Sequence, residues 1–146
     1  MEQARTQNTK PKKIKLDFKD SKYATGRRKR SIAKVWVKRG SGNIHVNGLK
    51  MNEYFKRPVH QIIVTRPLQI SEVESSYEVK CSVTGGGLSG QAGAIILAIS
   101  KALILHGENL KKNLKKDKLT TRDSRVVERK KYGDRKARRS FQFSKR

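Results

Sequence analysis

The segment from Gly85 to Gly90 places three glycines in a spacing that can bind a nucleotide. It reads G-x-G-x-x-G, and the apolar patterns on either side predict that it joins a strand to a helix. In that context the glycines let the backbone approach a pyrophosphate at the helix N-terminus. Glu108 lies at about the distance expected for a ribose-binding carboxylate. It follows Gly107 at the predicted helix end rather than a second parallel strand, which argues against a dinucleotide cofactor.

Two other catalytic motifs fail at defined positions of the same loop. A P-loop requires Lys and then Ser or Thr after its last glycine, where this chain has Gln91 and Ala92. A nucleophile elbow requires G-x-S-x-G, and Gln91 replaces its last glycine. We interpret the loop as a structural turn with Ser89 as helix N-cap, whose free N–H groups can hold an RNA phosphate. The sequence predicts no catalytic residue, no enzyme activity and no cofactor.

The histidines and the cysteine predict neither a metal site nor a disulfide. His45, His60 and His106 lie far apart and have no cysteine companions at metal-ligand spacing. Cys81 is the only cysteine, so no intramolecular disulfide is possible, which fits a reducing compartment.

Charge is distributed unevenly along the 146 residues, which carry a formal net charge of +24. Residues 1–39 have a net charge of +11, residues 40–110 of +1 and residues 111–146 of +12. This pattern indicates a nearly neutral core with two basic extensions, whose field attracts a polyanion. Nucleic acid is the first partner to consider, and an anionic membrane surface is the alternative. We expect no membrane partner, since we find no apolar run long enough to span a bilayer and no signal or transit pattern at the start.

Two basic clusters are the candidate RNA-binding residues. The first precedes the first predicted strand, and its four consecutive cations repel one another unless an anion is present. The second lies near the end of the chain, where arginines can bind phosphates bidentately and aromatic rings can stack on unpaired bases. A membrane-binding helix would instead show a continuous apolar face. The expected RNA-binding residues are Arg27, Arg28, Lys29, Arg30, Arg122, Arg125, Arg129, Lys130, Lys131, Arg135, Lys136, Arg138 and Arg139.

Apolar periodicity predicts the elements that position these clusters. Residues 33–38 alternate as a strand with one buried face, and the glycines of residues 40–42 predict a hairpin with residues 43–48. Further along the chain we expect a short helical turn at 51–55, a helix from Pro58 through Ile63, a strand at 77–84 with Cys81 on its buried face, a helix at 91–105 ended by Gly107, and a basic helix at 109–119.

These elements predict one two-layer α/β domain over residues 23–119. Residues 1–22 form a basic extension that lacks the apolar content to order itself, so we expect it to be disordered until bound. Residues 120–146 form an extended basic tail. At roughly 3.3 Å per residue, residues 125–146 can span about 70 Å.

Three segments carry a resemblance to a known family. They are Thr25–Lys29, Gly85–Ala94, and a third that runs from Leu119 through Glu128–Gly133 and Lys136–Arg139 to Arg146. Together they resemble small-subunit ribosomal protein nine of the bacterial type, over about residues 22–146.

The resemblance implies a fold and a place of action. The implied fold is an α/β domain of the ribosomal protein five second-domain type, with a left-handed βαβ crossover. The implied role is that of a structural constituent of the small ribosomal subunit, which binds rRNA in the head beside neighbouring ribosomal proteins and supports translation. Ser144, Lys145 and Arg146 would contact the peptidyl-site tRNA. The resemblance favours a bacterial-type cytoplasmic ribosome over an organellar one.

Overall fold

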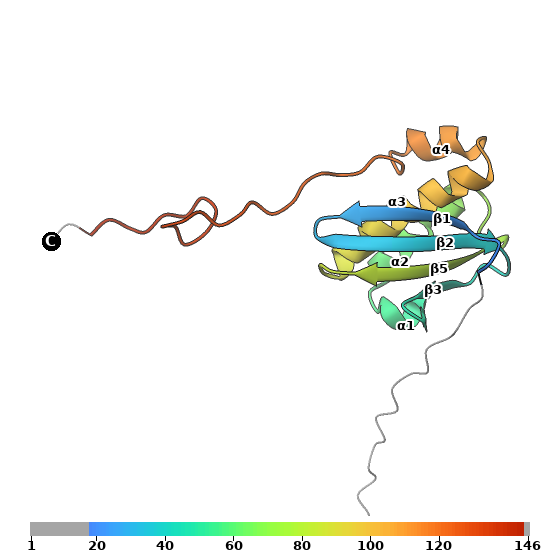
Figure 1. Ribbon diagram of the computed structural model, residues 1–146, viewed down its shortest axis with the longest axis horizontal. Coiled ribbons are helices and arrows are strands. Elements are labelled where there is room, and N and C mark those ends of the chain that lie inside the picture. The colour runs from blue at the N-terminus through green and yellow to red at the C-terminus, as the bar shows by residue number, and fades with distance from the viewer. Residues whose placement is uncertain (1–17, 145–146) are drawn as a thin grey trace, which may run out of the picture.

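The computed structural model describes residues 18–144 as a mixed α/β domain followed by an irregular tail (Figure 1). The strands are β1 (Lys22–Arg28), β2 (Ser31–Arg39), β3 (Ile44–Val46), β4 (Leu49–Lys50) and β5 (Tyr77–Thr84). The helices are α1 (Met51–Tyr54), α2 (Pro58–Ile70), α3 (Leu88–His106) and α4 (Leu110–Lys116). The expected α/β class is confirmed. The expected disorder of residues 1–22 falls largely on residues 1–17, which lie outside the described part of the chain.

The strands form one sheet in the order β1-β2-β5-β3-β4. β1 pairs antiparallel with β2, and β2 pairs antiparallel with β5. β3 pairs antiparallel with β4 and parallel with β5. Because β3 and β5 are parallel neighbours, the chain between them must cross from one end of the sheet to the other, and it carries α1 and α2 along this crossover.

Strand β1 is absent from the sequence-based prediction, which placed the first strand at residues 33–38. Arg27 and Arg28 therefore lie within a strand, and Lys29 and Arg30 form the turn to β2. The buried positions of β1 are Ala24 and Gly26, which are too small to produce a recognisable apolar alternation. Gly26 must be small, because a Cβ there would collide with the backbone oxygen of Ala94 on α3.

The predicted hairpin between residues 33–38 and 43–48 is wrong. β5 lies between β2 and β3, with Val35 opposite Cys81 and Val46 on the other side of the same cysteine. All three residues of β3 are buried, as expected for a strand inside a sheet rather than for half of an exposed hairpin. The glycines of residues 40–42 indicate only that the chain turns there. They carry no information about β5, which comes later in the chain and inserts between β2 and β3.

The core lies between the sheet and α2 and α3, which cover one face. Alternate residues of β2 and β5 face these helices, and the small buried residues of α3, such as Ala94 and Ala98, allow close packing on β1 and β2. Cys81 is buried as expected, and burial raises the pKa of its thiol well above the usual range.

Helix α3 corrects one expectation about membranes. Among the described residues it is the one helix long and apolar enough to cross a bilayer by length and composition. We had expected no such run. Its buried residues pack in the domain core, however, so this is weak evidence for a membrane span. Elsewhere Pro58 opens α2 at its first turn as predicted, and α2 continues to Ile70, beyond its predicted end.

Candidate nucleic-acid interface

The glycine loop is a structural turn that packs on the turn between β1 and β2. Gly85 and Gly86 have φ values of 73° and 59°, which favour glycine. A Cβ at Gly86 would collide with the hydroxyl oxygen of Ser31, which itself donates a hydrogen bond to the Gly85 carbonyl at 3.1 Å. The loop therefore fixes the start of α3 against the first basic cluster.

Ser89 is not the N-cap of α3, contrary to our expectation. Gly87 occupies that position, and no side chain caps the helix. Ser89 lies one residue inside the helix start, and its Oγ is 3.0 Å from Nε2 of His60, a side chain that is only 6% exposed. The hydroxyl is thus engaged with α2 instead of with the backbone N–H groups of its own helix.

A cavity of about 420 Å³ lies beside this helix start. Its lining includes the cations Lys29 and Arg57 together with the residues from Gly87 to Gly90, and no carboxylate. The uncapped N–H groups of a helix and nearby cations both favour negative charge. The potential in this cavity therefore suits an anion. Ser89 and His60 also line it and place a hydroxyl beside an imidazole, but Nδ1 of His60 has no hydrogen-bond partner among the described residues, so no third group orients the pair for nucleophilic catalysis.

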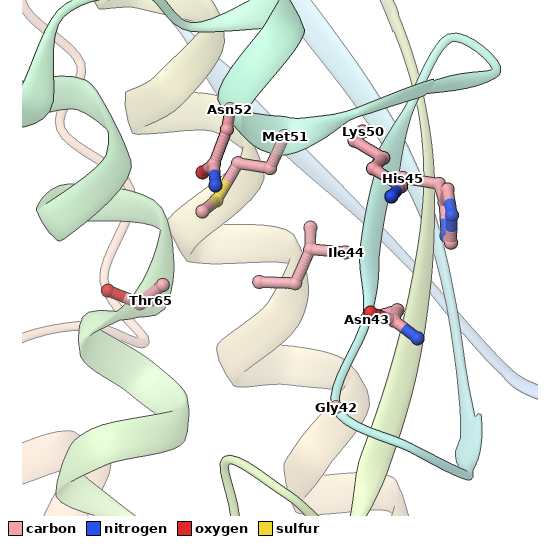
Figure 2. A pocket seen from close by; sticks show the side chains of 8 residues that line it. All are labelled: Gly42, Asn43, Ile44, His45, Lys50, Met51, Asn52 and Thr65. Atoms are coloured by element: carbon pink, nitrogen blue, oxygen red, sulfur yellow. The ribbon is translucent and has the colours of Figure 1, made fainter.

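A second cavity, of about 200 Å³, lies between β3 and the first two helices (Figure 2). Figure 2 shows Ile44 and His45 extending from opposite sides of β3, so the histidine does not share the helix-facing space with Met51 and Thr65. The lining contains no carboxylate. Among residues 18–144 no group of three or more His, Cys, Asp or Glu side chains is placed to hold a metal ion.

Arg27 and Arg28 point to opposite faces of β1. Arg27 is exposed on the face that also carries Tyr23, because alternate strand residues share a face. Arg28 lies against α3, where a Cβ added to Gly93 would stand 2.9 Å from its Cγ. Its Nη2 is 2.9 Å from Oδ2 of Asp123, and its Nη1 donates to the carbonyl of Arg125 at 3.0 Å. Within the predicted basic cluster, Arg27 therefore faces solvent, whereas Arg28 is bonded to Asp123 and to the Arg125 backbone.

Asp123 connects the first basic cluster to the tail. Arg125 donates to it from Nη2 at 2.7 Å and from its backbone N–H at 2.9 Å. These hydrogen bonds, with a smaller contribution from the charge of Arg28, hold the pKa of Asp123 well below its usual range. We call Arg28, Asp123 and Arg125 the tail junction. Asp123 is absent from the predicted site residues, although a lone carboxylate between Arg122 and Arg125 is a usable signal.

Beyond the tail junction the chain runs away from the domain without helix or strand (Figure 1). One local fold interrupts it, because Glu128 pairs with Lys131 at 3.3 Å and with Arg138 at 2.9 Å. The backbone N–H of Arg135 also donates to the carbonyl of Arg139 at 2.8 Å. The tail therefore contains a small closed loop.

The predicted RNA-binding residues of the tail are exposed, and they divide into two groups. The structure brings the first basic cluster and the tail together at a cavity of about 340 Å³ lined by Arg28, Lys29 and Arg125 to Val127. The cations further along the tail do not contact the domain. The exposed members are Arg122, Arg125, Arg129, Lys130, Lys131, Arg135, Lys136, Arg138 and Arg139.

The predicted tRNA-contacting residues lie at the far end of this tail. Ser144 is exposed and has no regular secondary structure. Lys145 and Arg146 lie outside the described residues.

One comparison with known proteins bears on this arrangement. A family model described as ribosomal protein S9/S16 matches residues 26–146. The match includes the turn between β1 and β2, the glycine loop, the tail junction and the whole tail.

Proposed function

The chain belongs to the ribosomal protein S9/S16 family and is a structural component of the ribosome, and we propose that its basic turn and tail bind small-subunit rRNA. Members of such a family are typically not enzymes. The protein serves translation as part of the small subunit.

The tail junction is the observation that supports the rRNA-binding proposal best. It joins the turn at Lys29 and Arg30 to the cations that follow Arg125, so that two regions far apart in the sequence form one basic surface. Arginine binds phosphate through a planar fork of donors. Such a surface suits the closely spaced phosphates of folded RNA.

We propose further that Ser144, Lys145 and Arg146 contact the tRNA in the peptidyl site. The tail leaves the domain directly (Figure 1), and residues 124–133 are exposed. Fully extended, residues 125–146 could span about 70 Å, so the end of the tail can act far from the domain that anchors it. In this proposal the part of the tail near the domain binds rRNA and the end of the tail contacts tRNA.

We also propose a fold type for the domain and a location for the protein within the ribosome. The parallel pair of β3 and β5, with α2 on the crossover between them, supports a βαβ unit, and we propose that it is of the ribosomal protein five second-domain type with a left-handed crossover. The proposed location is the head of the small subunit, beside neighbouring ribosomal proteins. We propose a bacterial-type cytoplasmic ribosome as the host particle.

Sedimentation tests the proposed function directly. The tagged full chain should sediment with small subunits at low salt and dissociate at high salt, because phosphate contacts release counterions. After a stringent wash the protein should carry no nucleotide. A chain that sediments apart from small subunits at every salt concentration, or one that retains a nucleotide, would refute the proposal.

A further inference from the structure

The face of the sheet opposite α2 and α3 is covered by no helix of the described structure and carries aromatic and basic side chains. Phe18 lies at its margin, with Nζ of Lys38 4.7 Å and Nζ of Lys80 5.7 Å from its ring centroid. Alternate residues of each strand point to the same face. Ala24, Val35 and Cys81 face the helices, so their neighbours along β1, β2 and β5 face away from them. The residues we call the open sheet face are Tyr23, Arg27, Lys34, Trp36 and Lys80.

Two aromatic rings lie side by side on the open sheet face. Tyr23 pairs directly with Trp36 across β1 and β2, with ring centroids 5.3 Å apart and an interplanar angle of 44°. The next residue in the same row is Lys80 of β5, whose Nζ lies 6.0 Å from the Trp36 ring. Tyr23 is 44% exposed. Trp36 is half-buried, so the pair presents an exposed ring and a partly exposed ring to solvent, with positive charge next to them.

The charges of this face are predominantly positive. Lys34 lies two residues from Trp36 on the same face of β2, about 7 Å along the strand. Arg27 continues the face to the turn of the first basic cluster. The one carboxylate that strands β1, β2 and β5 direct to this face is Glu78, which pairs with Lys38 at 3.6 Å. The net charge is complementary to an anionic partner.

We propose that the open sheet face binds an unpaired segment of RNA, with bases stacked on Tyr23 and Trp36 and phosphates near Lys34 and Arg27. This inference rests on the proposed rRNA binding and names a second surface for it. Exposed rings on a sheet can stack on bases only where those bases are unpaired. The core of a protein–protein interface is depleted in lysine, whereas lysines adjoin the rings here.

Trp36 makes the proposal measurable, because it is the only tryptophan in the chain. Single-stranded oligoadenylate should quench the fluorescence of the full-length protein as it binds. Inorganic polyphosphate, which has no bases, should bind without comparable quenching, and so should duplex RNA of the same length. Oligoadenylate binding without quenching would overturn the proposal, as would equal quenching by polyphosphate.

Matched variants separate ring stacking from charge. Tyr23→Leu should weaken oligoadenylate binding by roughly tenfold, in the range found for loss of one base–aromatic stack, while Tyr23→Phe should retain most of the affinity. Lys34→Ala should weaken binding more than Lys101→Ala, which removes an exposed cation from α3 on the other layer. Thermal denaturation should show that all four variants are folded. Equal losses for Tyr23→Leu and Tyr23→Phe would contradict stacking.

Ultraviolet cross-linking in purified small subunits distinguishes RNA binding by the open sheet face from the proposed rRNA binding by the basic turn and tail. We expect the peptide that carries Tyr23 or Trp36 to be linked to an unpaired rRNA nucleotide. A different result would be that the chain is present in the subunits, Lys34 cross-links to a neighbouring protein, and neither ring cross-links to RNA. The open sheet face would then bind a protein, and this inference would fail while the proposed function stands. If the chain is absent from the subunits, the proposed function itself fails.

Discussion

Adjacent arginines of β1 should contribute unequally to RNA binding. Arg27 is exposed, whereas the charge of Arg28 is partly offset by Asp123 at 2.9 Å. Removing one phosphate-bound cation lowers the salt dependence of log affinity by about one unit. We expect that change for Arg27→Ala and a smaller one for Arg28→Ala, measured by RNA titration between low and moderate salt. Identical slopes for the two variants would show that Asp123 does not offset Arg28.

Asp123→Asn should release the tail without unfolding the domain. The ion pairs of the tail junction are at least partly exposed to solvent, so their loss should leave the unfolding midpoint of the domain nearly unchanged. The distance distribution between spin labels introduced by Lys101→Cys and Val127→Cys should broaden, and buried Cys81 should not react with the label. Asp134→Asn is the control, because it changes a tail carboxylate outside the junction. A distribution unchanged by Asp123→Asn would mean that the junction does not orient the tail.

Acid should produce the same release in the unsubstituted protein. The pKa of Asp123 is depressed in the folded state, chiefly by hydrogen bonds from Arg125. A depressed carboxyl pKa stabilises the junction above its unfolded value of about 3.9, and this stabilisation is lost as the pH falls through the lower folded value. The spin-label distances should therefore stay narrow down to about pH 4 and broaden only in stronger acid.

At the scale of elements, the close contact between β1 and α3 requires a residue without a side chain at position 26. A Cβ at Gly26 would meet the Ala94 carbonyl oxygen and the Ala98 nitrogen, both of which are backbone atoms of α3. Gly26→Val should therefore separate strand and helix and destabilise the domain by about 3 kcal/mol or more, since overpacking of this kind is among the costliest changes. Thr25→Val, at the neighbouring exposed position, is the control in urea denaturation. Equal midpoints for the two variants would contradict the close packing.

The same elements show what could be predicted from the sequence. The helix at α3 and the strand at β5 were predictable because their apolar periods are long and unambiguous. β1 was not, because its buried positions are an alanine and a glycine whose importance appears only against α3. The clusters of cations were visible, but the ion pair of Arg28 with Asp123 joins residues far apart in sequence and depends on the folded domain.

At the scale of the whole molecule, the domain anchors a tail whose end we expect to act on its own. Deletion of Ser144, Lys145 and Arg146 should leave folding and subunit assembly intact. At roughly 0.5–1 kcal/mol for each of two exposed cation–phosphate contacts, tRNA affinity in the peptidyl site should fall about fivefold to thirtyfold. The measurement is the rate of tRNA dissociation from purified subunits. Substitution of Lys145 and Arg146 by glutamine is the matched variant, and an unchanged rate in both would exclude tRNA contact by the tip.

The position of β5 inside the sheet also determines the order in which the protein can fold. β5 lies between β2 and β3 but is synthesised after both, and after α2. During translation, therefore, no sheet hydrogen bonds can join β3 and β4 to β1 and β2 until β5, which ends at residue 84, has left the ribosome that makes it. Contacts of such long sequence separation slow folding and expose unpaired strand edges. A nascent chain of this protein must stay protected from aggregation until its central strand is synthesised, and only then can the surface that we propose binds RNA form.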